Sequence, residues 1–490
     1  MAFRIGASWL LVVLAVPLAA AILLVAVRPR GRASGWIAGA AAAVPLVGIL
    51  LFVPSLWQGD AVSLAIPWAP MAGISLDLRV DWLSLPFALT EAGVTLVAVV
   101  YAWGYHTPDE RTPYMYALLL LFALGMSGTT LADDLFLFFV FWEMMLLASC
   151  LLILVWGEGE QRGAVAFKYF VVTHLGSLMV LMAFLLLFNE AGSARLTTLR
   201  EAESLLPAAR VPIVIGLLLV GFSVKMAVFP VHIWLPDAHT VAPMPVTIML
   251  AAAMLSMGTY GVLRFTMGLF GFREMAPFAL PLMIAGVVSE IYGALMSLAE
   301  EDVKRIVAYS SVSQMGYILY GLGTYTQPGI VGATLHVVFH GIVKALLFMV
   351  LGLVIRATGK RQLGELGGLG PRLPTVAVCG AVGGLAIAGA PPLCLFVSEW
   401  MIFSGGFRTA HIALSVITLF GSLLSVAYAL RLMLGIFVGK LKAEVIEARP
   451  RAMLTSTVVL SATALVAGIL PTPLIAWISE ELSLLMGGAW

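Results

Sequence analysis

The sequence predicts an all-α polytopic membrane protein with about fourteen transmembrane helices. Of its 490 residues, 61% are hydrophobic and only 11% are charged, and the mean hydropathy is +1.04. A water-soluble domain needs a polar exterior that this composition does not supply. Apolar runs of about 20 residues, the length that crosses a bilayer, follow one another with short loops between them.

These apolar runs can be placed in order along the chain. The first, from Gly6 to Val27, is too long for a signal-peptide core and lacks a clear cleavage site, so we expect it to remain as the first membrane helix. The C-terminal EELSLLMGGAW is too short for another span. The predicted spans centre near residues 17, 44, 93, 122, 145, 178, 220, 255, 286, 313, 341, 385, 422 and 463.

Basic residues in the loops indicate the orientation of the chain. The loops after spans 1, 3, 5, 9, 11 and 13 hold about fifteen Lys and Arg residues, whereas the other side holds about eight. Three of these eight lie near residues 195–210 and argue weakly against the assignment. Because the more basic side faces the cytoplasm, we expect a multi-pass protein of the cell inner (cytoplasmic) membrane with both termini outside.

Two spans are interrupted by proline. Span 7 runs into FPVHIWLPDAHTVAPMP, and span 12 contains GLAIAGAPPLCLFVSEW. A broken helix at membrane depth must be buried or line a wet cavity. Breaks five spans apart predict two five-helix repeats. Because each repeat holds an odd number of helices, the two should be inverted relative to each other. The alternative is that the breaks are two unrelated packing kinks. The predicted segments are 1–110 (helices 1–3), 111–270 (first repeat, helices 4–8), 271–438 (second repeat, helices 9–13) and 439–490 (helix 14).

Eight ionisable side chains stand inside apolar runs. Such a residue is costly in a membrane unless it is paired or hydrated, and it usually marks an ion path. One buried pair could be a structural staple, but charges on five helices are too many for that explanation. The residues are Glu143 in span 5, Lys168 and His174 in span 6, Lys225 in span 7, His336, His340 and Lys344 in span 11, and Glu399 in span 12.

Glu143 and Lys225 are predicted to pair with each other. A carboxylate and an ammonium group in a low dielectric are strongly coupled. When such a pair separates, the lysine loses its proton more readily, which makes Lys225 a candidate proton donor. The alternative is a static ion pair that fixes two helices.

A second candidate proton path lies in span 11. His336, His340 and Lys344 occupy positions i, i+4 and i+8, so they share one helix face. Histidine titrates near neutrality, and the row could pass protons through intervening water towards Glu399. Histidines that only pack helices are one alternative. A metal site is another, but HVVFH lacks the zincin glutamate and shows no third ligand, so no metal is expected.

Polar residues near the span ends are more ambiguous. His232, Asp237 and His239 flank the first break, where they either line its mouth or cap the broken helix ends. Residues expected at the surface or in a solvated cytoplasmic cap are Asp133, Asp134, Asp302, Lys304 and Arg305.

The sequence also excludes several classes of function. It shows no phosphate-binding glycine loop, nucleophile–base set, metal cluster or basic nucleic-acid patch. Its three cysteines stand in apolar runs and have the character of small buried hydrophobes. We therefore expect no cofactor and no redox chemistry in this chain itself.

Several long motifs resemble one family of membrane proteins. FVFWEMMLLASCLLI, VKMAVFPVHIWLPDAHTVAPMPV, MGTYGVLRF, DVKRIVAYSSVSQMGY and HVVFHGIVKALLF resemble the antiporter-like subunits of respiratory complex I. That family includes the large Mrp cation/proton antiporter subunits and their equivalents in group 4 membrane-bound hydrogenases. The resemblance covers roughly spans 3 to 13, and it implies fourteen helices in two inverted five-helix repeats with helices 7 and 12 broken.

The resemblance also implies roles for individual residues. By motif, Glu143 matches the family's helix-5 glutamate and Lys225 its helix-7 lysine. Lys344 matches the helix-11 lysine of L-type subunits, and the two histidines before it match the histidines that accompany that lysine. Glu399 stands where the M-type subunit has glutamate and many relatives have lysine.

Two positions depart from the family pattern. Ser256 stands where the family usually has a lysine, and Gln314 where the M-type subunit has histidine. Either hydrated Ser256 passes protons by water, or the two half-channels are less tightly linked. The chain length fits the M-type or the Mrp D-type, whereas the L-type carries a long C-terminal lateral helix.

Three functions follow as hypotheses. The first is a proton-translocating subunit of a complex I-type quinone oxidoreductase or group 4 hydrogenase, driven by electron transfer in partner subunits. The second is the D-type subunit of an Mrp-type Na⁺/H⁺ antiporter, and the third is a non-conducting scaffold. Glu399 with FWEMML favours the first, and Ser256 supports the third. The expected partners are homologous antiporter-like subunits and small membrane subunits, with H⁺ or Na⁺ as the ion and no nucleic acid.

Overall fold

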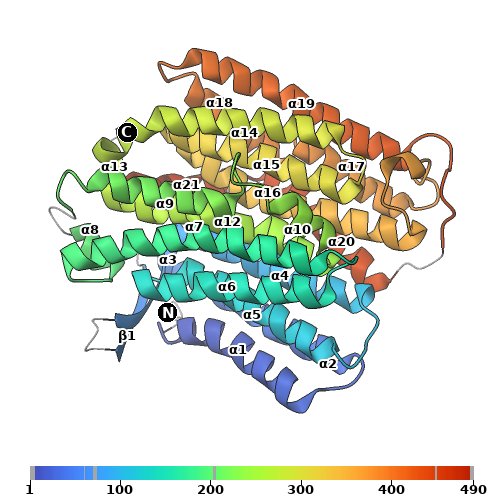
Figure 1. Cartoon of the computed structure of the whole chain (residues 1–490), viewed down its shortest axis with the longest axis horizontal. Helices are drawn as coiled ribbons and strands as arrows, with labels where there is room; N and C mark the ends of the chain where they lie inside the picture. Colours follow the sequence, from blue (N-terminus) through green and yellow to red (C-terminus); the bar gives the residue numbers. More distant parts are fainter. Residues whose placement is uncertain (1–5, 60, 70–73, 202–205, 447–449, 486–490) are drawn as a thin grey trace.

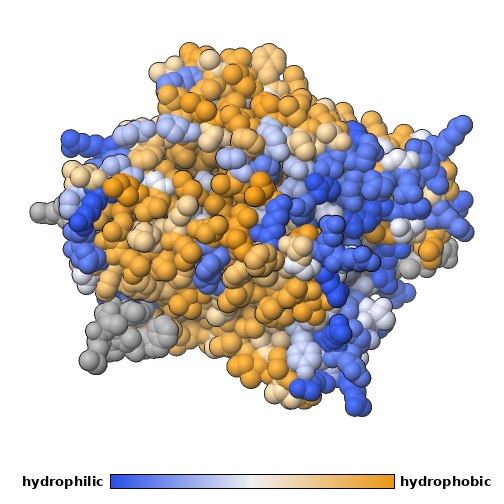
Figure 2. All heavy atoms as spheres, in the orientation of Figure 1, coloured by the Kyte–Doolittle hydropathy of each residue, from blue (hydrophilic) through white to orange (hydrophobic). Residues whose placement is uncertain are grey.

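The computed structural model describes residues 6–59, 61–69, 74–201, 206–446 and 450–485. Its helices lie side by side along the long axis of the molecule (Figure 1). Among the described residues, ten helical runs are long and apolar enough to cross a membrane. Figure 2 shows apolar side chains over the middle of the molecule and polar side chains gathered at its right-hand end. The prediction of a helical, multi-pass membrane protein is confirmed.

The N-terminal region contains a β-hairpin as well as helices. Its elements are α1 (Trp9–Val27), α2 (Ala33–Leu50), α3 (Val53–Trp57), β1 (Val62–Ala69), β2 (Ile74–Val80) and α4 (Ser84–Tyr105). The two strands are antiparallel, with Val62 opposite Val80. The predicted all-α fold did not include this hairpin, which lies between the second and third predicted spans. The period-2 alternation of ISLDLRV, with Leu78 buried, is the pattern that would have indicated a strand.

The middle of the chain holds the first predicted repeat (111–270) and the start of the second. Its elements are α5 (Thr112–Leu131), α6 (Leu135–Trp156), α7 (Arg162–Ala191), α8 (Leu196–Glu201), α9 (Val211–Met226), α10 (Leu235–Val241), α11 (Met244–Met249), η2 (Leu250–Met254), α12 (Leu255–Gly261), η3 (Val262–Met267), α13 (Gly268–Met275) and η4 (Ala276–Phe278). The chain leaves α9 at Ala227, which adopts a left-handed conformation with φ 56°. Helix geometry resumes at Leu235, so the predicted break in helix 7 is confirmed.

The last region holds the second predicted repeat and the C-terminal helices. Its elements are α14 (Ala279–Ala299), α15 (Val303–Gly323), α16 (Gln327–Thr358), η5 (Leu363–Glu365), α17 (Pro374–Ile387), α18 (Cys394–Gly406), α19 (Ile412–Phe437), α20 (Arg451–Ile469) and α21 (Thr472–Leu485). The gap between α17 and α18 confirms the predicted break in helix 12. The count of fourteen spans, the inversion of the repeats and the four segment boundaries stay predictions.

A buried ion pair joins the end of the hairpin to helix η3. Arg264 places Nη1 2.6 Å from Asp81 Oδ2 and Nη2 2.7 Å from Asp81 Oδ1, and both side chains are buried. Asp81 also accepts a hydrogen bond from the backbone N–H of Ser84 at the start of α4. Burial acts to raise the pKa of Asp81, but the charge and hydrogen bonds of Arg264 outweigh it and hold that pKa well below its usual range.

The predicted surface position of Asp133 and Asp134 is wrong, because both side chains are buried. Asp134 caps α6, where its Oδ1 accepts hydrogen bonds from the N–H groups of Phe136 and Leu137. Asp134, which begins an apolar run, is therefore a helix cap that lies inside the protein and not at its surface.

Candidate functional site

Glu143 pairs with His174 rather than with Lys225. Glu143 Oε2 in α6 lies 2.9 Å from His174 Nδ1 in α7. Among the described residues, Lys225 Nζ in α9 has no hydrogen-bond partner, and it lies 4.8 Å from the centroid of the Trp142 ring. The predicted direct Glu143–Lys225 ion pair is therefore wrong. Trp142 precedes Glu143 on α6, so the lysine still sits beside the carboxylate-bearing turn in a cation–π contact.

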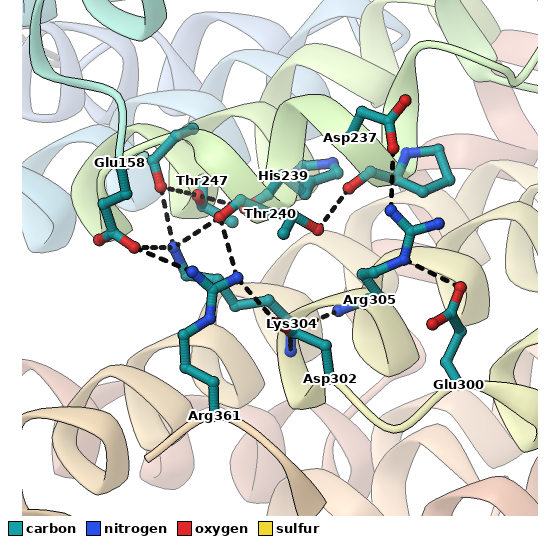
Figure 3. A network of polar contacts seen from close by, with 12 residues as sticks. Glu158, Asp237, His239, Thr240, Thr247, Glu300, Asp302, Lys304, Arg305 and Arg361 are labelled. Carbon is teal, nitrogen blue, oxygen red and sulfur yellow. Dashed lines mark hydrogen bonds and ion pairs between the residues drawn. The ribbon is translucent and has the colours of Figure 1, made fainter. Parts of the chain in front are cut away.

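Asp237 and Arg305 belong to a charged network at one end of the broken helix (Figure 3), and Lys168 also pairs with this aspartate. Lys168 Nζ lies 2.8 Å from Asp237 Oδ2, and Arg305 Nη1 lies 2.8 Å from Asp237 Oδ1. Arg305 Nε also lies 2.9 Å from Glu300 Oε1. Because the Lys168 and Asp237 side chains are 41% and 33% exposed, this network meets water and links α7, α10 and α15.

The solvated cap predicted for Asp302, Lys304 and Arg305 is wrong for the lysine. Lys304 is only 1% exposed, and its Nζ donates hydrogen bonds to Thr240 O at 3.3 Å and Ala242 O at 3.0 Å. Figure 3 shows this ammonium group beside the end of α10. The last carbonyl groups of a helix carry partial negative charge, so Lys304 both satisfies and stabilises that end.

His239 and His232 stand inward from the charged network. His239 is fully buried, neither of its ring nitrogens has a hydrogen-bond partner among the described residues, and its ring stacks on Phe348 of α16 at 5.4 Å. The ring of His232 stacks on Phe229 and meets the ring of Tyr292 edge-on. The ring of His239 therefore caps no helix end, which removes one of the two alternatives for that residue.

The predicted row on α16 lies entirely inside the protein. His336 Nδ1 lies 3.0 Å from Ser398 Oγ, and its Nε2 lies 2.9 Å from Gln314 Oε1. Lys344 Nζ donates to the Val307 carbonyl at 2.9 Å and to Ser310 Oγ at 2.5 Å. These contacts join α16 to α15 and α18. Gln314, one of the departures from the family pattern, is thus a direct hydrogen-bond partner of the row.

His340, between those two residues, is 1% exposed, and its Nε2 has no hydrogen-bond partner among the described residues. The side chains at the two ends of the row are therefore hydrogen-bonded, whereas the middle one has a ring nitrogen without a partner among the described residues. A buried ring nitrogen without a protein partner calls for a water or a moving proton.

Glu399 lies against the break in helix 12. Its side chain is 5% exposed, and Oε1 has no hydrogen-bond partner among the described residues. It follows Ser398, the hydroxyl that contacts His336, so the carboxylate stands on the same turn of α18 as a contact of the row. Gly389, with φ 67°, leaves room for the carboxylate, because a Cβ at that position would collide with it.

A Gly389→Ala variant should therefore lose more stability than Gly359→Ala. Both glycines have φ 67°, so each alanine pays roughly 1–2 kcal/mol for a left-handed conformation, but the space around Gly359 is open. Only Gly389→Ala also displaces Glu399. Thermal unfolding of the detergent-solubilised complex measures the difference, and equal losses would contradict this placement of the carboxylate.

Two further buried carboxylates were missed by the sequence analysis. Glu91 in α4 is fully buried and accepts a hydrogen bond from Ser127 Oγ at 2.5 Å. Glu290 in α14 is fully buried too, with Tyr317 and Glu399 close enough to act on it electrostatically. Each stands alone in an apolar run, as Glu143 does, so the same criterion would have found both.

Ser256 lies on α12, which contacts both α9, the helix of Lys225, and α16, the helix of the histidine–lysine row. Its hydroxyl is buried and donates to the Ala253 carbonyl of its own helix. The π-helical turns η2 and η3 flank its helix α12, and such turns are frequent at functional sites. The central position therefore holds a neutral hydroxyl where the family usually has a cationic side chain.

Comparisons with known proteins find a family and relatives that match most of this chain. A family described as NADH:quinone oxidoreductase/Mrp antiporter, TM matches residues 132–425. The chain is 36% identical over 448 residues to NAD(P)H-quinone oxidoreductase chain 4 3 of Picosynechococcus sp., covering 88% of this chain and 79% of that one. It is 34% identical over 453 residues to chain 4-2 of Synechocystis sp., covering 88% and 78%.

Solved structures share the fold along nearly the whole chain. A chain of the Mrp complex from Dietzia sp. has a TM-score of 0.88 at 25% identity, covering 99% of this chain and 98% of that one. A chain of respiratory complex I from Thermus thermophilus has a TM-score of 0.84 at 24% identity, covering 98% and 100%, and shows the fold alone. On the family match and the identity to its relatives, this chain belongs to the NADH:quinone oxidoreductase/Mrp antiporter family of membrane proteins.

Proposed function

We propose that this chain is the proton-translocating, antiporter-like membrane subunit of a complex I-type quinone oxidoreductase or a related group 4 membrane-bound hydrogenase. Electron transfer in partner subunits would drive it, and the chain itself would carry no cofactor. The observation that carries this proposal is a set of buried ionisable groups without protein partners. Among the described residues, these include Lys225 Nζ, His340 Nε2 and Glu399 Oε1.

Buried charges that only held helices together would be paired and fully hydrogen-bonded, because an unpaired buried charge is strongly destabilising. Unpartnered groups beside broken helices are instead what a water-filled proton path requires. The relatives named NAD(P)H-quinone oxidoreductase chain 4 support the redox-driven form of this proposal.

The first half of the proposed path runs from the charged network to Lys225. Lys168 and Asp237 meet water, and Glu143 with its partner His174 lies on the neighbouring helices. When His174 holds a proton, it neutralises Glu143, and the lysine loses that favourable charge. Uptake and release of a proton by the Glu143–His174 pair would thus control whether Lys225 keeps its own proton.

The second half runs along α16 to the break in helix 12. Lys344, His340 and His336 follow one another on one buried face, and Ser398 leads from His336 to Glu399. His239 stacks on α16 and could feed this row from the charged network. Ser256 would connect the halves by water, since its hydroxyl group neither gains nor loses a proton at neutral pH.

The second candidate function is that of the D-type subunit in an Mrp-type Na⁺/H⁺ antiporter. It rests on the similarity to a chain of the Dietzia Mrp complex, which extends over 98% of that chain. In both candidates, the partners are other membrane subunits, the membrane is the cell inner membrane, and both termini lie outside.

One experiment separates the two candidates. The native complex is purified through a tag on this chain and sealed into vesicles with a pH-sensitive dye inside. We expect proton movement when an electron donor (NADH or hydrogen) and a quinone are added, and none when a Na⁺ gradient is imposed without them. Proton movement driven by the Na⁺ gradient alone would contradict the redox-driven proposal and favour the Mrp-type antiporter.

A further inference from the structure

A pocket of about 510 Å³ opens where several helices begin and end at one side of the molecule. The starts of α2, α5 and α20 and the ends of α4 and α16 surround it. These are ends of apolar helical runs long enough to cross a membrane, so the pocket lies at the level where the bilayer meets water.

The walls of this pocket are positively charged. Arg32, Arg356 and Arg451 line it, and no carboxylate is among the described residues that do. Helices α2 and α20 begin here without a side-chain cap, so their first N–H groups and the positive ends of their dipoles face the same region. Arginine and free helix N–H groups together favour an anion, and phosphate above all.

The hydroxyl group of Tyr116 is also available to a bound acceptor. Tyr116 is only 3% exposed and lines the pocket. Within the described part of the chain, nothing accepts or donates a hydrogen bond at its hydroxyl. An acceptor oxygen bound in the pocket would therefore give this hydroxyl a hydrogen-bond partner.

The aromatic residues beside the pocket indicate an anion that carries an apolar tail. Trp36 and Trp103 pack with ring centroids 4.6 Å apart, and Trp103 Nε1 donates to Gly35 O at 2.8 Å. Trp36 is nevertheless 64% exposed, and further along α2 Val47 is 53% exposed. Tryptophan is enriched at the headgroup level of membranes, and the exposed face of α2 offers apolar surface for acyl chains.

We propose that this pocket binds the phosphate headgroup of an anionic phospholipid, with the acyl chains lying along α2. The guanidinium groups of Arg32 and Arg451 hold the phosphate oxygens, together with the Tyr116 hydroxyl. Arg356 already donates to the Tyr105 carbonyl at 2.9 Å, so it fixes the wall of the site and adds charge. The site does not depend on whether the chain conducts protons.

The test measures lipid retention by the intact complex. Delipidated complex is reloaded with vesicles of phosphatidylglycerol or of phosphatidylcholine, and the lipid that stays bound is counted by mass spectrometry. The double variant Arg32→Ala/Arg451→Ala should bind phosphatidylglycerol roughly thirty-fold more weakly, at about 1 kcal/mol for each arginine. Arg408→Ala, which removes an exposed arginine outside the pocket, should bind it as the wild type does.

Tyr116→Phe removes one hydroxyl and leaves the charges, so it reports on the site even where the double variant fails to assemble. We expect it to weaken retention of phosphatidylglycerol severalfold. Equal retention by Tyr116→Phe and the wild type, or equal binding of phosphatidylcholine, would overturn the proposal. Displacement of the lipid by millimolar inorganic phosphate would assign the pocket to a soluble phosphate instead and would also overturn it.

Discussion

An Asp81→Ala variant should assemble poorly or not at all. The change leaves Arg264 buried without its bidentate carboxylate partner, and breaking a buried pair in this way costs roughly 3–5 kcal/mol. It also removes the acceptor that caps α4 at Ser84. The measurement is the unfolding temperature of the solubilised complex and the amount of this chain that it retains.

The matched control is Arg79→Ala. Arg79 Nε lies 3.3 Å from the same carboxylate, but the arginine side chain is 26% exposed, so its loss should cost about 1 kcal/mol or less. Similar losses for the two variants would mean that burial of the Asp81–Arg264 pair does not hold the hairpin end to η3.

The same ion pair should be insensitive to mild acid. Because Arg264 holds the pKa of Asp81 well below its usual range against the opposing effect of burial, the carboxylate is charged in the folded protein at any physiological pH. Its stabilising contribution is complete above the unfolded-state pKa of about 4 and is lost only as the pH falls below that value towards the folded-state pKa. Acidification from pH 8 to pH 5 should therefore leave this contribution unchanged.

A Lys344→Met variant should uncouple proton movement from electron transfer. Methionine replaces the aliphatic part of the lysine side chain and keeps α16 packed, but it has no ammonium group to hold a proton. The contacts of Lys344 are a carbonyl and a hydroxyl, both on α15. A neutral replacement therefore leaves no unpaired carboxylate behind, and the expected loss is in conduction rather than in assembly.

The measurement is the number of protons moved per pair of electrons in vesicles, with electron transfer recorded in parallel. Lys360→Met is the control, because Lys360 is 47% exposed and pairs with Glu365 at the surface. We expect the Lys344 variant to move fewer protons per electron pair and the Lys360 variant to match the wild type. Normal stoichiometry with Lys344→Met would remove the α16 row from the path.

Features that depend on local sequence could be predicted correctly. The prolines and glycines of the two interrupted spans dictate helix breaks whatever surrounds them, and both breaks are present. The placing of three ionisable residues on one face of α16 follows from helix periodicity alone, and all three are buried.

Features that depend on how helices rotate against one another could not be predicted from the sequence. The pattern identified Glu143 as a buried charge but could not tell that α7 presents His174 to it, with Lys225 turned towards Trp142. The charged neighbours of Lys304 favoured a surface position, but its ammonium group is hydrogen-bonded to carbonyl groups at the end of α10. Contacts between distant segments decide these cases.

The central claim is that buried ionisable residues of this chain carry protons through the membrane. Proton uptake by sealed vesicles, driven by electron transfer in the complex, tests it most directly when wild type is compared with Lys225→Ala and Glu143→Gln. We predict that both variants keep electron transfer and lose protons moved per electron pair. An unchanged proton stoichiometry in both variants would contradict the claim and would leave this chain as a scaffold.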